Sequence, residues 1–179
     1  MFFVSDIYTT APSEFKTDLQ AKTYQALDKL HIPFERVDTD EAITMEDCVQ
    51  IDKKLNMKMV KTLFLCNRQQ TAFYLFITAG DKPFRSKEFS NALEVARVSF
   101  APLELMEQML GTKVGAATVF SAMLDTGDAV QIIFDRAVIQ APWYGCSDGT
   151  TTGYMRVQTE HILQKFLPFA NHIPAIIEV

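Results

Sequence analysis

The stretch MKMVKTLFLCN, Met57 to Asn67, contains an apolar run with the composition of a buried β-strand. Lys61 lies at the start of this apolar run, and burying an unpaired ammonium is costly in free energy. Two interpretations are open. A lysine at the first position of a strand usually lays its methylenes along the protein and keeps its amine in water. Alternatively, Lys61 points into a pocket and meets an anionic ligand.

The sequence on both sides of this stretch predicts a helix before the strand and a second strand after it. TLFLCN and the following TAFYLFIT are separated by RQQ, which predicts two adjacent strands of a hairpin. Upstream, Thr44-Met-Glu-Asp47 has the form of a capping box with Asp in place of Glu, which predicts a helix through about Leu55. This predicted helix ends shortly before Lys61.

Shorter patterns predict the remaining elements of a mixed α/β chain. The segment GCSDGTTTG, residues 145–153, is expected to be a loop. We expect helices over 13–30 with Ser13 as N-cap, over 86–93, over 102–110 with Gly111 past its end, and after Thr159; we expect strands at 34–37, 97–101, 130–135, 137–142 and 174–179.

Length and composition indicate a single domain covering residues 1–179. Hydrophobic residues make up 48% and charged residues 22%, as in a globular protein. No apolar stretch approaches the ~20 residues that span a bilayer, and the start lacks the marks of a signal peptide. We therefore expect a cytoplasmic protein with no membrane partner.

The sequence supports no metal site, cofactor or hydrolytic triad. Cys48, Cys66 and Cys146 are far apart and form no CxxC, and the three histidines lack ligand spacing. No serine lies in GxSxG, and neither GxGxxG nor GxxxxGK[ST] occurs. We predict that no metal and no cofactor is bound.

The net charge of −5 argues against a general nucleic-acid binder, and DNA is not expected as a partner. A local basic site remains open, because Lys53, Lys54, Lys58 and Lys61 lie within nine residues. The same run is equally compatible with a solvated helix face.

Two segments combine glycine with small residues between well-defined elements. VGAATVF (114–120) and YGCSDGTTTGY (144–154) could leave backbone amides open to a ligand, or could be plain turns.

The order of these pieces resembles the YbaK/ProRS-associated family of aminoacyl-tRNA deacylases, most closely its free-standing prolyl-tRNA-synthetase-associated branch. YQALDKLHIPFERVDT (24–39) is similar to that branch's opening phrase LxIPYERVEH, and KTLFL (61–65) matches K[NT]LFL. Residues 115–119 correspond to the family's GxxxP loop. The ending HILQKFLPFANHIPAIIEV (161–179) resembles FLxxxGHxPxxxxL. The resemblance covers nearly the whole chain and implies a mixed, curved, partly barrel-like sheet surrounded by helices.

The resemblance also implies a function and a site. Such proteins remove a wrong amino acid from a charged tRNA, in this branch typically alanine from the tRNA for proline. Editing is needed because one missing methylene changes binding by only about 1–3 kcal/mol. The pocket lysine, here Lys61, holds the terminal adenosine and its phosphate. Backbone amides of the loop fix the ester, and a water assisted by the ribose 2′-hydroxyl attacks it. The implied catalytic residues are Lys61, Gly115, Ala116, Ala117, Thr118 and Val119, and the implied substrate-binding residues are Lys58, Thr62, Phe120, Tyr144, Asp148 and Thr151.

Several positions depart from the family pattern. Thr62 stands where the branch favours asparagine, and Val119 replaces the proline of GxxxP. If Thr151 to Gly153 align with the end of HPxxNxAT, Tyr144 and Gly145 replace His-Pro, and Asp148 replaces the asparagine.

Three functions stay open on these grounds. The first is a trans-editing deacylase of altered specificity that acts on the 3′ acceptor end of an aminoacyl-tRNA, with an aminoacyl-tRNA synthetase as a further partner. The second is an inactive relative that binds tRNA, a synthetase or a nucleotide-like ligand. The third is a hydrolase of a small ester, which would leave the lysine cluster without a purpose.

Overall fold

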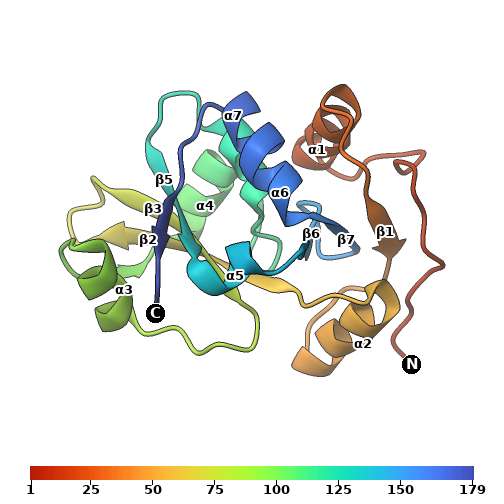
Figure 1. Cartoon of the computed structure of the whole chain (residues 1–179), viewed down its shortest axis with the longest axis horizontal. Coiled ribbons are helices and arrows are strands. Elements are labelled where there is room, and N and C mark those ends of the chain that lie inside the picture. Colours follow the sequence, from red (N-terminus) through yellow and green to blue (C-terminus); the bar gives the residue numbers. More distant parts are fainter.

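Eight strands form two separate sheets in the computed structural model, which describes residues 1–179 (Figure 1). The five-stranded sheet has the order β4-β2-β3-β5-β8, and the three-stranded sheet has the order β1-β7-β6. The strands are β1 (Glu35–Asp38), β2 (Val60–Asn67), β3 (Phe73–Ala79), β4 (Val98–Phe100), β5 (Val130–Asp135), β6 (Trp143–Ser147), β7 (Gly153–Gln158) and β8 (Ala175–Ile177).

The helices cover both sheets. They are α1 (Asp18–Lys29), α2 (Met45–Leu55), α3 (Ser86–Leu93), α4 (Leu103–Leu110), the 3₁₀ helix η1 (Val119–Leu124), α5 (Arg136–Gln140), α6 (Thr159–His161), the π-helical turn η2 (Ile162–Phe166) and α7 (Leu167–Phe169). The last three run on continuously, and the π turn lies just before Pro168, which has no N–H to donate within a helix.

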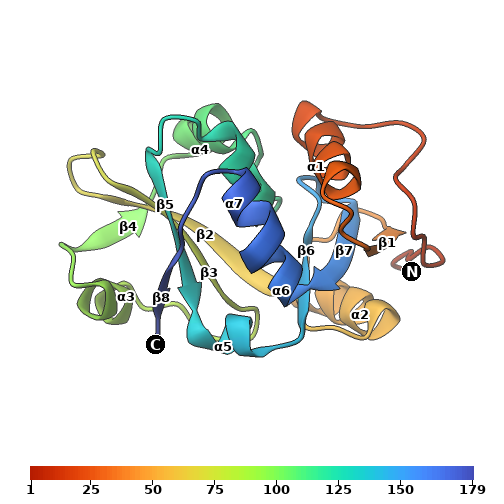
Figure 2. The ribbon, with the colours of Figure 1, turned by 45° about the horizontal axis from the view of Figure 1, so that its top comes forward.

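The predicted hairpin is the centre of the larger sheet. β2 and β3 pair antiparallel, with Lys61 opposite Thr78, while β3, β5 and β8 run parallel to one another. Successive residues of β3 enter different cores. Leu75 and Ile77 pack in the main core, whereas Tyr74 and Phe76 pack against α3 in a second core. The sheet is thus covered on both faces, with α4 and α7 on one side and α3 on the other (Figure 2).

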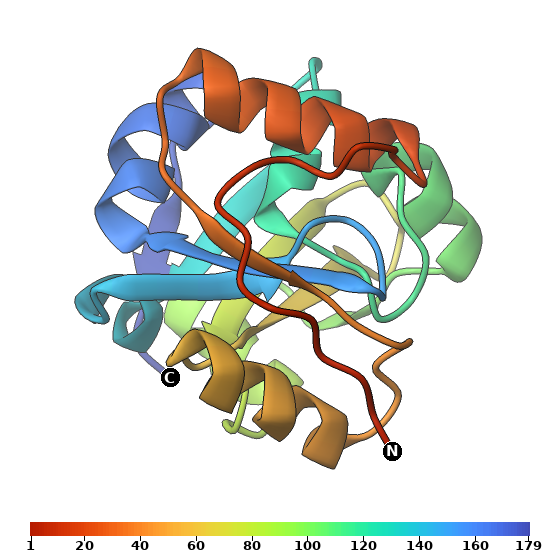
Figure 3. The ribbon, with the colours of Figure 1, turned by 90° about the vertical axis from the view of Figure 1, so that its right-hand side faces the viewer.

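The three-stranded sheet is also covered on both faces. Met155 of β7 faces the main core, to which α1 contributes Leu27, whereas Tyr154 packs with Ile51 and Leu55 of α2. Figure 3 shows α1 and α2 on opposite sides of these strands.

The predicted elements match the observed ones with the following exceptions. The capping box at Thr44 and Asp47 is present as predicted. The first helix starts later than predicted, because Thr17 and not Ser13 accepts the bond from the Gln20 N–H. The strand predicted over 137–142 is wrong. Asp135 accepts the Ala137 N–H and caps the short helix α5 there. The loop predicted from residue 145 begins only after Ser147, because residues 143–147 form β6, which was not predicted as a strand. No strand was predicted over 153–158 either, where β7 forms.

The mixed α/β class is confirmed, with one refinement. Two open sheets replace the single, partly barrel-like sheet that was expected, and neither closes on itself. Among the helices, none has both the length and the apolar character needed to cross a bilayer.

Candidate active site

A cavity of about 560 Å³ lies along the first half of β2. It exists because β4 pairs only with the end of β2, from Leu65 to Asn67, so that residues 60–64 have no strand on that side apart from an isolated bridge at Met59. Four of the predicted site residues line this cavity together, although they come from two distant segments: Lys61, Thr62, Gly115 and Ala117.

Lys61 is the only charged residue on the cavity wall. Its side chain is half-buried, and its Nζ donates to the carbonyl oxygen of Lys82 at 2.7 Å. No carboxylate lies within 4.0 Å of this ammonium. A lysine that is partly desolvated and lacks a counterion can attract an anion strongly. The placement of Lys61 in a pocket favours the second of the two interpretations of the sequence.

The loop from Gly115 to Thr118 presents unused backbone donors. The N–H groups of Gly115, Ala117 and Thr118 make no hydrogen bond within the chain, whereas Ala116 N–H donates to the Lys113 carbonyl at 3.1 Å. Gly115 has a φ of +88°, which L side chains rarely adopt. Gly115 and Ala117 line the cavity, so their free N–H groups are available to a ligand oxygen. Free backbone donors of this kind are used in oxyanion binding.

The other predicted residues of this loop are buried beneath it. Thr118 caps η1, and Val119 and Phe120 are fully buried. The Phe120 ring packs edge-on against Phe166, with centroids 5.0 Å apart. Ala116 is also buried. These side chains hold the loop against the core, while Gly115 and Ala117 face the cavity.

Tyr144 is fully buried in β6 and does not line the cavity. Its hydroxyl has no hydrogen-bond partner. Burial raises the pKa of Tyr144 well above its ordinary value; the nearby Thr62 side chain opposes this but does not reach hydrogen-bonding geometry. Tyr144 thus lies behind Thr62, which does line the cavity.

Asp148 is buried and saturated with hydrogen bonds from the chain itself. Its Oδ2 accepts from Gln20 Nε2 at 2.9 Å and from the Tyr24 hydroxyl at 2.8 Å. Its Oδ1 accepts from the Thr150 backbone N–H and hydroxyl. The carboxylate fastens the loop after β6 onto α1, and it does not face the cavity.

The remaining predicted residues lie outside the cavity. Lys58 is exposed just before β2 and does not line it. Thr151 lines a neighbouring polar cavity of about 550 Å³ that also contains Ala116 and shares Val114 with the first cavity. A Cβ added to Gly115 would lie 3.7 Å from the methyl carbon of Thr151. The two cavities are therefore separated by the 114–116 segment.

Sequence reasoning missed most of the apolar wall. The missed residues come from α2, β4, α4, β6 and β7, and include Cys48, Phe100, Leu103, Met106, Cys146 and Tyr154. Burial raises the pKa of the Cys146 thiol, which disfavours the thiolate form that a nucleophile requires. No local motif could have indicated these residues, since only the packing of five elements brings them together.

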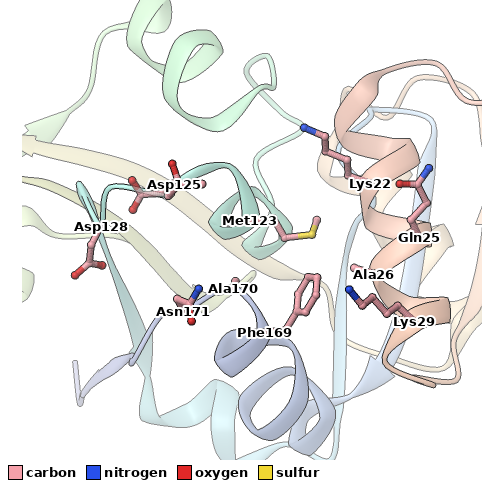
Figure 4. Close-up of a pocket in the computed structure, with 11 residues that line it drawn as sticks. Lys22, Gln25, Ala26, Lys29, Met123, Asp125, Asp128, Phe169, Ala170 and Asn171 are labelled. Atoms are coloured by element: carbon pink, nitrogen blue, oxygen red, sulfur yellow. The ribbon is translucent and has the colours of Figure 1, made fainter.

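One group of potential metal ligands lies elsewhere, near a separate cavity of about 580 Å³ (Figure 4). Ligand atoms of Asp125, Asp128 and His172 lie within 4.8 Å of one another. Two of these residues, Asp125 and His172, already form hydrogen bonds within the chain. His172 Nε2 lies 2.9 Å from Asp125 Oδ2 and Nδ1 lies 2.7 Å from the Ala170 carbonyl, while Asp125 also accepts N–H groups at the start of β5. The group ties the turn after α7 to β5.

The fold and the cavity together define a class of two-sheet α/β protein in which one ammonium and a loop with free backbone N–H groups line the same cavity. The profile of the aminoacyl-tRNA editing domain matches residues 39–165, and this chain belongs to that family. The prolyl-tRNA editing protein ProX of Acetoanaerobium sticklandii is 26% identical over 124 residues, which cover 68% of this chain and 76% of ProX.

Solved structures show the same fold. A candidate trans-editing enzyme for prolyl tRNA synthetase superposes with a TM-score of 0.64 at 14% identity, covering 92% of this chain and 99% of that one. The hypothetical protein APE2540 superposes with a TM-score of 0.62 at 11% identity, covering 88% and 98%. The resemblance drawn from the sequence motifs is confirmed by these comparisons.

Proposed function

We propose that this chain is a trans-editing aminoacyl-tRNA deacylase that hydrolyses the ester of a mischarged tRNA. One observation carries the proposal: a half-buried ammonium without a counterion and a loop with free amides line the same cavity. Family membership supports an aminoacyl ester as the ligand.

In the proposed reaction, Lys61 binds the phosphate of the terminal adenosine at the cavity wall. The N–H groups of Gly115 and Ala117 donate to the ester carbonyl oxygen and stabilise its negative charge as water adds to the carbon. The bond from that carbon to the ribose oxygen breaks, and this oxygen leaves with a proton. The products are a free amino acid and uncharged tRNA.

Specificity and partners belong to the same proposal. ProX is a prolyl-tRNA editing protein, and we propose a small amino acid on the tRNA for proline as the substrate. The net charge of −5 implies weak and local tRNA binding, which a synthetase partner would assist. Recognition of the single-stranded 3′ end suits stacking and 2′-hydroxyl contacts. We place this activity in the cytoplasm, with translation.

The test is the hydrolysis of a panel of aminoacyl-tRNAs, including alanyl- and seryl-tRNA for proline. Lys61→Ala is expected to lower kcat/KM by about 10- to 100-fold, the effect of losing one hydrogen bond to a charged group. Lys165→Ala, which removes an exposed lysine of η2, is the matched control and should match the wild type. If the wild type is no faster than buffer on every substrate, the deacylase proposal fails and the chain is a binding relative.

A further inference from the structure

Three apolar side chains at the mouth of the cavity are largely exposed. Phe100 is 62% exposed, Leu103 63% and Val114 61%, and all three line the same cavity. Single exposed apolar residues are ordinary on protein surfaces, but a group around one opening marks an interaction site. We call these three residues the apolar lip.

The backbone of the lip is held in place. Phe100 is the last residue of β4 and lies opposite Leu65 of β2. The next residue, Ala101, donates its N–H to the Phe64 carbonyl at 2.9 Å. The Phe100 ring also contacts the ring of Phe84, with centroids 5.6 Å apart and planes at 58°. A ring positioned in this way loses little conformational entropy when a flat partner stacks on it.

Lys61 and Phe100 share one face of the sheet. Side chains alternate along β2, so Lys61, Leu63 and Leu65 point to one side, and Phe100 is the cross-strand neighbour of Leu65. Leu65 lies four positions after Lys61 in β2, which corresponds to about 13 Å along the strand. A ligand that contacts both the ammonium and the aromatic ring is therefore extended, with an anionic part and a flat apolar part.

Single-stranded nucleic acid has this chemistry. Proteins bind it by combining cations along its backbone with aromatic rings on which its bases stack. The terminal adenosine of a tRNA is preceded by unpaired nucleotides, and the chain must leave the cavity through its mouth.

We propose that the apolar lip is the platform on which the base preceding the terminal adenosine stacks, with Phe100 as the stacking residue. The inference rests on the proposed function and adds to it a second nucleotide, recognised by a side chain of β4. Leu103 and Val114 line the same cavity, and their role in the proposal is to exclude water from the stacked base.

The experiment compares two substrates that carry the same amino acid. One is aminoacyl-tRNA, and the other is the aminoacyl ester of adenosine, which has no preceding nucleotide. Phe100→Ala is expected to raise KM for aminoacyl-tRNA about tenfold, the effect of losing one stacked base, and to leave the adenosine ester unaffected. Phe100→Trp should restore KM, whereas Phe100→Leu should not, because leucine has no aromatic face.

The control variant is Phe169→Ala. Phe169 is 38% exposed in α7 and lines the separate cavity of Figure 4. This variant should behave as the wild type on both substrates. Unfolding curves and the mass in solution of each variant show whether the fold or self-association has changed.

Each outcome decides the proposal. If Phe100→Ala affects both substrates equally, or neither, the lip is not a stacking platform, although the deacylase proposal stands. If Phe100→Ala converts a dimer into a monomer, the lip is an interface with a second copy and the proposal is overturned. If the wild type hydrolyses neither substrate, the proposed function fails. The lip is then tested by the binding of an uncharged RNA oligonucleotide ending in CCA, and equal affinities of wild type and Phe100→Ala would overturn it.

Discussion

Val119 occupies the position at which the family's loop carries proline, and its surroundings accept either residue. It is the first residue of η1, so its N–H has no acceptor within the helix and makes no other hydrogen bond. Thr118, the residue before it, has φ −149° and ψ 151°, which is the conformation that a residue before proline prefers. Valine in place of proline therefore leaves the unfolded chain with more conformational freedom and does not change the path of the loop in the folded state.

This geometry predicts the effect of restoring the proline. Val119→Pro should change the free energy of unfolding by less than about 1 kcal/mol, because a compatible proline offsets any loss of packing. Deacylation should be as fast as in the wild type or faster. Chemical denaturation and hydrolysis rates check both expectations. A large loss of stability would show that the loop requires the Val119 side chain.

Asp148 forms its hydrogen bonds within the fold and does not line the cavity. All four of its hydrogen-bond partners are donors, from Gln20, Tyr24 and Thr150. Gly153 is required opposite this carboxylate, because a Cβ there would lie 2.3 Å from Asp148 Oδ2.

The Asp148→Asn variant should lower the free energy of unfolding by about 2–3 kcal/mol, since its amide NH₂ would face two donors in a buried site. Thermal or urea unfolding measures this loss. Asp6→Asn, at an exposed carboxylate, is the control and should be neutral. If Asp148→Asn is as stable as the wild type but impaired in hydrolysis, Asp148 has a role in the site.

At the scale of elements, the connection between α2 and β2 sets where β2 begins, one residue before Lys61. Asn56 ends α2 in the left-handed conformation, with a φ of 50°. Asp52 of α2 then accepts the Met59 N–H at 3.0 Å. Burial raises the pKa of Asp52 to about 6, and Asp81 adds to this rise, while the Met59 N–H and Lys58 oppose it.

The raised pKa makes this joint sensitive to pH. Because the folded state holds the proton more tightly than the unfolded state, the charged form costs stability above about pH 6, and this cost disappears as the pH falls below about 4. Asp52→Asn keeps an oxygen for Met59 and should stabilise the protein at pH 8 by about 1 kcal/mol, a value reduced for partial exposure. Denaturation at pH 8 and pH 4 tests this. If Asp52→Asn changes the free energy of unfolding equally at pH 8 and pH 4, the raised pKa of Asp52 is contradicted.

At the scale of the whole molecule, a chain of contacts joins the core to the cavity. The buried Asp135 at the end of β5 accepts the Thr78 hydroxyl at 2.7 Å and Lys82 Nζ at 2.8 Å. The carbonyl of Lys82 in turn holds Lys61. The ammonium in the cavity is therefore oriented from the strand two places away in the sheet.

Burial by itself would raise the pKa of Asp135, but hydrogen bonds from Lys82, Thr78 and the Ala137 N–H outweigh it, and the pKa lies below its ordinary value. The stability contributed by this carboxylate is present above about pH 4 and is lost as the pH falls further. Asp135→Asn should cost about 2 kcal/mol at pH 7 and less at pH 3. It should also raise KM, because Lys82 no longer positions Lys61. An unchanged KM in the folded variant would show that Asp135 does not influence the position of Lys61.

Local chemistry in the sequence was enough to predict the hairpin around Lys61, the capping box and most of the helices. Apolar alternation, caps and turn residues act within a few positions of one another, so they can be detected without the fold. The family motifs extended this to the GxxxP-like loop. The strand expected over 137–142 failed because the Asp135 side chain caps a helix there, a choice that apolar composition does not reveal.

Only the tertiary structure decided which residues share the cavity. It placed Gly115 and Ala117 beside Lys61, buried Tyr144 behind Thr62 and turned Asp148 toward α1. It also left Phe100 exposed at the mouth. The physical reason is that burial and pairing depend on contacts between segments far apart in sequence, such as the free half of β2 that β4 leaves uncovered. The sequence alone determined which groups are candidates for the chemistry, and the packing of the two sheets determined which of them face the cavity.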